Sequence, residues 1–197
     1  MAKIIRTHLN CLVLTLKFQR MLTRFIFKTL LGWTLKGDFD PNIKKTVVVV
    51  APHTSWHDFY ILALARKLVS VDVNYVAKKE LFDGPFGWYF KWMGGEAIDR
   101  SSKNNKVQQI VNIFNSNKEF RLAIAPEGTR KKVKQWKTGF YRIAEQAKVP
   151  LTFVILDYKT KTVSIPEEFY VSGDYEKDII AIRAFYKDAV GKVPEYT

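Results

Sequence analysis

The chain has 197 residues, of which 47% are hydrophobic. This composition supplies a core for one domain and excludes an intrinsically disordered chain. Lysine and arginine number 32 against 19 acidic residues, which gives a formal net charge of +13. Such an excess favours an anionic partner, which can be a nucleic acid, an anionic membrane or a phosphorylated substrate. The single cysteine, Cys11, excludes an intramolecular disulfide and a cysteine-based zinc site.

The N-terminal segment combines basic and apolar side chains at helical spacing. On a helical wheel of about 100° per residue, residues 3–31 place their cations in one sector and their aliphatic side chains largely opposite. A helix lying in a membrane interface has this pattern, and so does an amphipathic helix packed on its own domain. The apolar run from Leu9 to Leu16 is too short to span a membrane. No small-residue cleavage site follows it, so we expect it to remain in the mature protein.

From residue 45 onward, strand and helix patterns alternate. The run TVVVVA (residues 46–51) is typical of a strand buried on both faces. Further strands are expected at 73–77, 96–99, 121–125 and 151–158, with 162–165 returning as a hairpin, and helices at 58–69, 87–92, 105–115, 139–147 and 178–190. This alternation predicts an α/β fold, with a largely parallel central sheet flanked by helices.

The sequence PHTSWHD (residues 52–58) follows the first buried strand directly. Ligands of open α/β sheets bind outside the carboxyl ends of the strands. A histidine at that position, His53, can act as a general base, and Asp58 can hold its imidazole. Two other interpretations remain open. Asp58 can cap the next helix, or His53 and His57 can bind a metal with Asp58 or Glu127, although the chain has no His-Glu-x-x-His pattern.

A second motif, APEGTR (residues 125–130), also follows a buried strand and leads into lysines 131, 132, 134 and 137. Arg130 offers a planar fork of donors that suits a phosphate. Gly128 lets the backbone approach a ligand closely, and Glu127 can orient Arg130 or an acceptor hydroxyl. A tight turn with a solvated basic face is the alternative interpretation.

A third motif, GGEAIDR (residues 94–100), ends in Arg100, which is a second candidate phosphate ligand. The aromatic stretch LFDGPFGWYFKWM (residues 81–93) precedes it. Such a stretch can line a tunnel for an apolar ligand, enter lipid, or pack in the core.

In this order, the motifs resemble those of the 1-acylglycerol-3-phosphate acyltransferase family, the glycerolipid acyltransferases. Residues 53–58 are similar to the family's His-x4-Asp signature, 95–100 to its second block, 127–130 to its third, and Val149-Pro150 to its fourth. The resemblance covers roughly residues 45–158. Ala125 departs from it, because the family often has an aromatic residue there.

The resemblance implies an acyltransferase domain over residues 37–197, preceded by a basic amphipathic helical segment for membrane association over residues 1–36. His53 would deprotonate the acceptor hydroxyl, and Asp58 would hold His53. The hydroxyl would attack the thioester of acyl-CoA or acyl carrier protein directly, with no acyl-enzyme. The implied ligands of the acceptor's phosphate and glycerol are Arg100, Glu127, Gly128, Thr129 and Arg130, with Lys137 as a further candidate.

The implied acceptor is a lysophospholipid such as 1-acylglycerol 3-phosphate, which would become phosphatidate at the cytoplasmic face of an anionic membrane. Neither a metal nor a cofactor is expected. Other acceptors remain open, namely glycerol 3-phosphate or an acylated amino-acid lipid. A thioesterase also fits these residues, as does a basic protein that binds lipid or nucleic acid without catalysis. Nucleic acid is not the expected partner, because the chain has no helix-turn-helix, zinc-finger or RNA-binding consensus.

Overall fold

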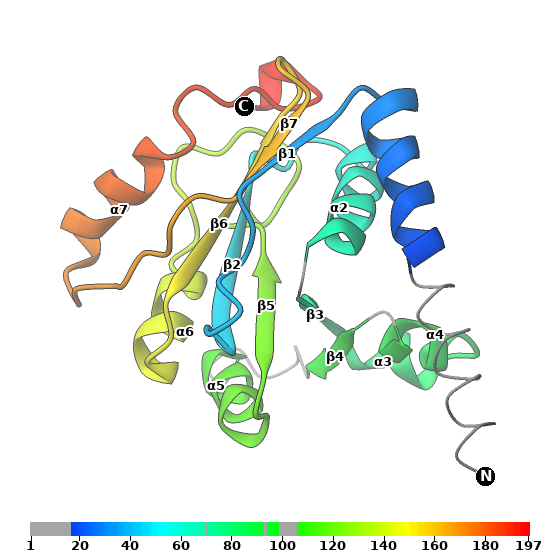
Figure 1. Ribbon diagram of the computed structural model, residues 1–197. Helices are drawn as coiled ribbons and strands as arrows, with labels where there is room; N and C mark the ends of the chain where they lie inside the picture. Colours follow the sequence, from blue (N-terminus) through cyan, green and yellow to red (C-terminus); the bar gives the residue numbers. More distant parts are fainter. Residues whose placement is uncertain (1–16, 70, 93, 99–105) are drawn as a thin grey trace, which may run out of the picture.

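A computed structural model describes residues 17–69, 71–92, 94–98 and 106–197. Its centre is a seven-stranded sheet with the order β1-β7-β6-β2-β5-β3-β4 (Figure 1). The strands are β1 Thr34–Lys36, β2 Lys45–Ala51, β3 Asn74–Lys78, β4 Gly95–Ile98, β5 Phe120–Ile124, β6 Leu151–Asp157 and β7 Thr162–Ser164. Neighbours in the sheet are parallel, apart from the antiparallel hairpin of β6 and β7. The predicted α/β fold with a largely parallel sheet is confirmed.

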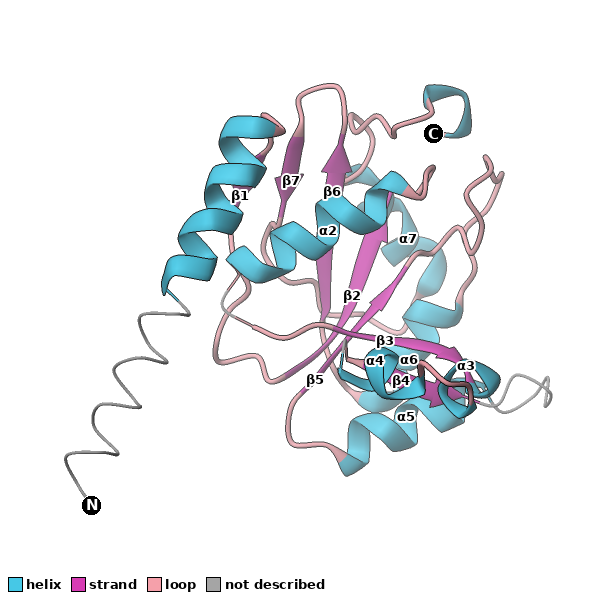
Figure 2. Ribbon diagram, turned by 90° about the vertical axis from the view of Figure 1, so that its right-hand side faces the viewer, coloured by secondary structure: helices cyan, strands magenta, loops and turns pink. Residues whose placement is uncertain are grey.

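Helices cover both faces of this sheet (Figures 1 and 2). A helix over residues 17–25 continues into η1 Ile26–Leu30. The others are α2 His57–Leu68, α3 Lys79–Asp83, α4 Gly87–Trp92, α5 Lys106–Ser116, α6 Gly139–Ala147, α7 Tyr175–Ala184 and η2 Pro194–Tyr196. α5, α6 and α7 pack on one face, and α2 packs on the other beside the helix of residues 17–30.

β2 lies at the centre of the sheet and is buried on both faces, as its unbroken run of valines predicts. Successive side chains of a strand point to opposite faces. Val47 and Val49 therefore join the hydrophobic cluster under α5, α6 and α7, while Val48 and Val50 join the one under α2. Their partners include Phe114, Phe140 and Ile182 in the first cluster, and Phe27, Ile61 and Ala65 in the second. Burial of each valine stabilises the fold by roughly 1.5–3 kcal/mol.

Four of the described elements differ from the prediction. β1, α3 and η2 were not predicted, because each is too short to show a period of its own. The last helix was predicted over 178–190 but spans Tyr175–Ala184. It begins earlier because the Asp174 side chain caps it by accepting a hydrogen bond from the Lys177 N–H. The chain then turns, and the Tyr186 hydroxyl donates to the Val49 carbonyl at 2.7 Å.

Only the second half of the predicted N-terminal amphipathic segment falls within the described residues, and 1–16 lie outside them. In the described half, Phe27 is buried against the sheet, whereas Phe18, Met21, Leu22 and Phe25 are exposed. The segment ends in β1, which pairs in parallel with β7. The division of the chain at residue 36 stays a prediction. No helix in the described part of the chain is long and apolar enough to cross a membrane.

Candidate active site

The loop between β2 and α2 brings His53 and Asp58 together. His53 follows the carboxyl end of β2, and Asp58 lies in the first turn of α2. The His53 Nδ1 and Asp58 Oδ2 atoms are 2.9 Å apart. The aspartate is fully buried, while the histidine side chain is 26% exposed. This geometry lets a buried carboxylate orient an imidazole that a substrate can still reach.

The Asp58 carboxylate accepts hydrogen bonds at both oxygens. Oδ2 accepts from His53 and from the backbone N–H groups of Thr54 and Ser55, each at 2.9 Å. Oδ1 accepts from the Tyr158 hydroxyl at 2.8 Å. Burial alone would raise the pKa of Asp58, but the hydrogen bonds from His53, Ser55 and Tyr158 outweigh it and leave that pKa below its ordinary value. Asp58 is therefore ionised at neutral pH.

An ionised carboxylate only accepts hydrogen bonds, so the proton of the short contact belongs to His53 Nδ1. The other ring nitrogen, Nε2, is then the basic one. The interpretation of Asp58 as a helix cap is wrong, because the N-cap residue of α2 is Trp56, and the His57 N–H at the start of the helix donates to the Ser55 hydroxyl oxygen. Asp58 instead lies inside the helix and closes the preceding loop through the N–H groups of Thr54 and Ser55.

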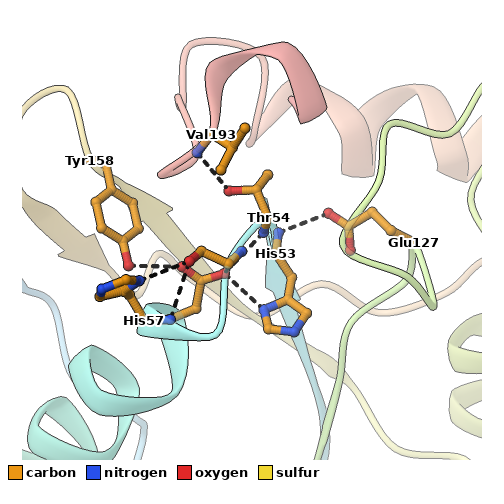
Figure 3. Close-up of polar contacts among 8 residues, drawn as sticks. His53, Thr54, His57, Glu127, Tyr158 and Val193 are labelled. Carbon is orange, nitrogen blue, oxygen red and sulfur yellow. Dashed lines mark hydrogen bonds and ion pairs between the residues drawn. The ribbon is translucent and has the colours of Figure 1, made fainter.

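His57 has a different set of neighbours. Its Nδ1 lies 3.0 Å from the Ser55 hydroxyl oxygen, and its ring packs 4.2 Å from that of Trp56. The two imidazole rings lie apart (Figure 3). Among the described residues, no group of three or more histidine, cysteine, aspartate or glutamate side chains is placed to hold a metal ion.

The structure also brings Glu127 to this loop. β5 is a parallel neighbour of β2, so the segments that follow the two strands meet at one edge of the sheet. Oε1 of Glu127 accepts a hydrogen bond from the His53 N–H at 3.2 Å. The side chain is only 9% exposed, and within the described structure its Oε2 has no hydrogen-bond partner. Burial raises the pKa of Glu127, and the hydrogen bonds that it accepts only partly offset this.

The rest of the second motif forms a tight turn after β5. Gly128 has a φ of +62°, and its N–H donates to the Ala125 carbonyl. The Lys137 side chain occupies the space that a Cβ on Gly128 would take. Thr129 and Arg130 are exposed on the same turn. The turn therefore places one ammonium group against Gly128 and a guanidinium group two residues further on.

The third motif is only partly described. Its strand is present as β4, at the edge of the sheet, but Arg100 lies outside the described residues. In the aromatic stretch before it, Phe82 is buried, whereas Phe86, Trp88 and Tyr89 are exposed. A role in acyl binding or in lipid contact stays a prediction for this stretch.

Two contacts at the site were not predicted. Tyr158, directly after β6, donates to Asp58, and the Val193 N–H donates to the Thr54 hydroxyl oxygen at 3.1 Å (Figure 3). The sequence does contain a signal for Tyr158, because this residue ends a predicted strand and the carboxyl ends of parallel strands form the site. No local pattern points from Thr54 to a residue 139 positions away.

Comparison with known proteins gives consistent results. The family model described as Acyltransferase matches residues 34–156. A 1-acyl-sn-glycerol-3-phosphate acyltransferase of Streptococcus pneumoniae is 32% identical over 136 residues, which are 63% of this chain and 50% of the relative. One of Saccharomyces cerevisiae is 27% identical over 148 residues, 71% of this chain and 48% of the relative. The chain thus spans about half the length of the curated relatives that it matches.

The fold is similar to that of a solved structure, the 1-acyl-sn-glycerophosphate (LPA) acyltransferase PlsC from Thermotoga maritima. The TM-score is 0.57 at 20% identity, and the similarity covers 86% of this chain and 76% of that one. The family match extends from β1 into β6 and includes residues 53–58 and 127–130. The predicted resemblance is confirmed: the chain belongs to the Acyltransferase family.

Proposed function

We propose that this protein is a 1-acylglycerol-3-phosphate O-acyltransferase. It moves a fatty acyl group from acyl-CoA or acyl carrier protein to the free hydroxyl of 1-acylglycerol 3-phosphate, which gives phosphatidate. The 2.9 Å contact between His53 and the buried Asp58 carries this proposal, because it prepares a general base at the carboxyl end of the central strand. The names of the two curated relatives support the choice of acceptor.

In the proposed reaction, Nε2 of His53 takes the proton of the acceptor hydroxyl. The hydroxyl oxygen attacks the thioester carbonyl carbon, the carbon–sulfur bond breaks, and the leaving thiolate takes the proton from Nε2. His53 returns to its neutral form, so no acyl-enzyme and no net change in the protein result. Asp58 stabilises the imidazolium that forms transiently. A general base of this kind contributes about 10²–10⁴-fold to the rate.

The turn after β5 is the proposed binding site for the acceptor's phosphate and glycerol. Its residues are Glu127, Gly128, Thr129 and Arg130, together with Lys137. Glu127 ties the turn to the backbone of His53, which supports a binding mode in which Arg130 or Lys137 would hold the phosphate near the base. Arg100 is proposed as a further phosphate ligand from the third motif.

We further propose that the enzyme works at the cytoplasmic face of an anionic membrane. The helix of residues 17–30 and α2 lie side by side, and both expose apolar side chains (Figures 1 and 2). These are Phe18, Met21, Leu22, Phe25 and Leu30 on the first helix, and Trp56, Phe59 and Tyr60 at the start of α2. Basic residues Lys17, Arg20, Arg24 and Lys28 accompany them. Apolar and basic side chains together suit an anionic bilayer surface.

The test is an acyl-transfer assay with the purified chain, anionic vesicles and palmitoyl-CoA. CoA release and lipid product are measured with lysophosphatidate, with glycerol 3-phosphate, with a panel of other lysolipids, and with no acceptor. We expect phosphatidate only with lysophosphatidate. His53→Ala should lower its formation by at least about 10²-fold, whereas the matched control His57→Ala should keep it.

Other outcomes select other functions. CoA release that needs no acceptor would identify a thioesterase, in which the base activates water. Product from glycerol 3-phosphate or from another lysolipid would change the acceptor but keep the chemistry. Full activity in His53→Ala would overturn the assignment of the base. No transfer with any acceptor, repeated with acyl carrier protein as donor, would leave a protein that binds lipid without catalysis.

A further inference from the structure

Tyr158 makes a contact with the site that the proposed mechanism has not used. It follows β6 directly and lies outside residues 34–156, which the family model matches. Its hydroxyl donates to Oδ1 of Asp58 at 2.8 Å, whereas His53 uses Oδ2 (Figure 3). Tyr158 and His53 therefore contact opposite oxygens of one buried carboxylate.

The Tyr158 ring is held by segments that are distant in the sequence. The ring of the buried Trp33 meets it edge-on, with centroids 4.9 Å apart and an interplanar angle of 90°. Lys192 places its ammonium nitrogen 5.7 Å from the centre of the ring. The Tyr158 N–H donates to the Val190 carbonyl at 2.8 Å. These contacts fix the ring, and the ring holds the hydroxyl oxygen beside Oδ1 of Asp58.

The hydroxyl remains a donor throughout the working range of pH. Burial raises the pKa of Tyr158 well above its ordinary value, and the hydrogen bond to ionised Asp58 raises it further. A neutral hydroxyl that donates to a carboxylate stabilises the charged form and withdraws part of its negative charge. Tyr158 thus acts on Asp58 in two ways, by fixing its orientation and by reducing its pull on the His53 ring.

We propose that Tyr158 is a positioning residue for acyl transfer, which holds the Asp58 carboxylate so that Oδ2 faces His53. This inference rests on the proposed function of His53 as general base. The geometry makes it specific. Three donors meet Oδ2, from His53, Thr54 and Ser55, and the Tyr158 hydroxyl at Oδ1 adds the second point that fixes the plane of the carboxylate.

Removal of the hydroxyl should change the titration of the base in a defined direction. The other titratable or charged groups described around this pair are His57 of α2, Glu127 after β5, and Lys192. All of them remain in Tyr158→Phe, which also keeps the ring contacts with Trp33 and Lys192. The Thr54 and Ser55 N–H groups still hold Oδ2 beside His53, and without the hydroxyl Asp58 keeps more of its charge and binds the imidazolium more strongly. Protonated His53 should therefore persist to higher pH.

The chain offers a matched control in Tyr141. Its hydroxyl donates to Oδ2 of the buried Asp178 at 2.9 Å, a tyrosine–aspartate hydrogen bond between α6 and α7. We expect Tyr158→Phe to lower kcat by about 3- to 10-fold, with a smaller change in KM. The acidic limb of its profile of kcat/KM against pH should move to higher pH. Tyr141→Phe should lose thermal stability but leave that limb in place.

A second measurement does not depend on activity. The chain has three histidines, so the imidazole signals can be followed by NMR through a pH titration and assigned with His57→Gln and His8→Gln. The midpoint for His53 should rise in Tyr158→Phe and stay unchanged in Tyr141→Phe. An unchanged midpoint together with an unchanged acidic limb would overturn the proposal, whatever the loss of stability. A shifted His53 midpoint in a protein that shows no acyl transfer would refute the proposed function but support the effect of Tyr158 on His53 through Asp58.

Discussion

At the scale of single residues, the site contains two buried carboxyl groups in opposite environments. Asp58 accepts four hydrogen bonds, and its pKa is lowered. Glu127 accepts one from the backbone of His53, its Oε2 has no partner in the described structure, and its pKa is raised. Pairs of acids whose environments separate their pKa values are typical of catalytic sites. Here the negative charge lies on Asp58, the carboxylate that contacts the His53 imidazole.

Asp58→Asn should test this charge. The amide would present a donor or a neutral oxygen to His53 and would favour the wrong ring tautomer. We expect kcat to fall by about 10³–10⁴-fold and the fold to remain, as judged by circular dichroism. The matched control is Asp178→Asn, which alters another buried aspartate with several hydrogen bonds. Equal losses of kcat in the two variants would contradict a specific role for Asp58.

Glu127→Gln should separate stability from activity. Because the pKa of Glu127 is raised in the folded protein, its contribution to stability is present at pH values below its ordinary pKa of 4.5 and lost as pH rises through the folded value. At pH 8, Glu127→Gln should therefore be more stable than the wild type by roughly 1 kcal/mol, or about 2–4 °C in Tm.

The difference should shrink at about pH 4, where both side chains are neutral. Thermal denaturation at the two pH values measures it, while acyl transfer by the variant should fall. The control Glu145→Gln, at an exposed position of α6, should change stability by less than about 0.5 kcal/mol. A wild type that is the more stable protein at pH 8 would contradict the prediction.

At the scale of elements, parallel pairing decides which loops meet. β2 pairs in parallel with both β5 and β6, so their carboxyl ends lie at one edge of the sheet. The segments that follow these strands carry His53, Glu127 and Tyr158 in turn. Three residues far apart in the sequence thereby share one site. The turn after β5 contributes through its shape, since Gly128 has a positive φ and packs against Lys137.

Gly128→Ala should disturb that turn. A left-handed φ costs an alanine roughly 1–2 kcal/mol, and the new Cβ would displace the Lys137 side chain. We expect Tm to fall by about 2–6 °C and the KM for lysophosphatidate to rise. Gly139→Ala is the matched control, because no atom lies within 4 Å of the Cβ that it adds at the start of α6. That variant should keep the wild-type KM and gain up to about 1 kcal/mol.

At the scale of the whole molecule, exposed apolar side chains and positive charge occur together on the face covered by α2 and the helix of residues 17–30. The helices on the other face, α5 to α7, pack over the larger hydrophobic cluster. The face proposed to contact lipid is therefore the one opposite the larger cluster, and the loop with His53 leads directly into a helix of that face.

Binding to vesicles should depend on this face. Phe18→Ser/Phe25→Ser should weaken co-sedimentation with anionic vesicles by about tenfold or more, and added salt should weaken the binding of the wild type. Ile180→Ser is the control, since Ile180 is 74% exposed on α7 at the opposite face. Equal losses in the two variants, or binding that is indifferent to salt, would contradict the membrane orientation proposed above.

Much of the architecture follows from local sequence. The run TVVVVA predicts the central strand because a strand buried on both faces needs apolar side chains at every position. The alternation of strands and helices predicts a parallel sheet. Ligands of such sheets bind outside the carboxyl ends of the strands, which predicts His53 and Glu127 in one site. The family motifs lie on these same loops. Fold class and the centre of the site can therefore be predicted from patterns that span a few residues each.

Other features depend on where distant segments meet. β1 exists because it pairs with β7, and α7 ends early as the chain turns to bring Tyr186 to Val49. Tyr158 donates to Asp58 across 100 positions of sequence, and Val193 to Thr54 across 139. Hydrophobic periodicity is a property of one segment and can be read along the chain. A hydrogen bond between two segments depends on the path of the backbone between them, which only the packed tertiary structure decides.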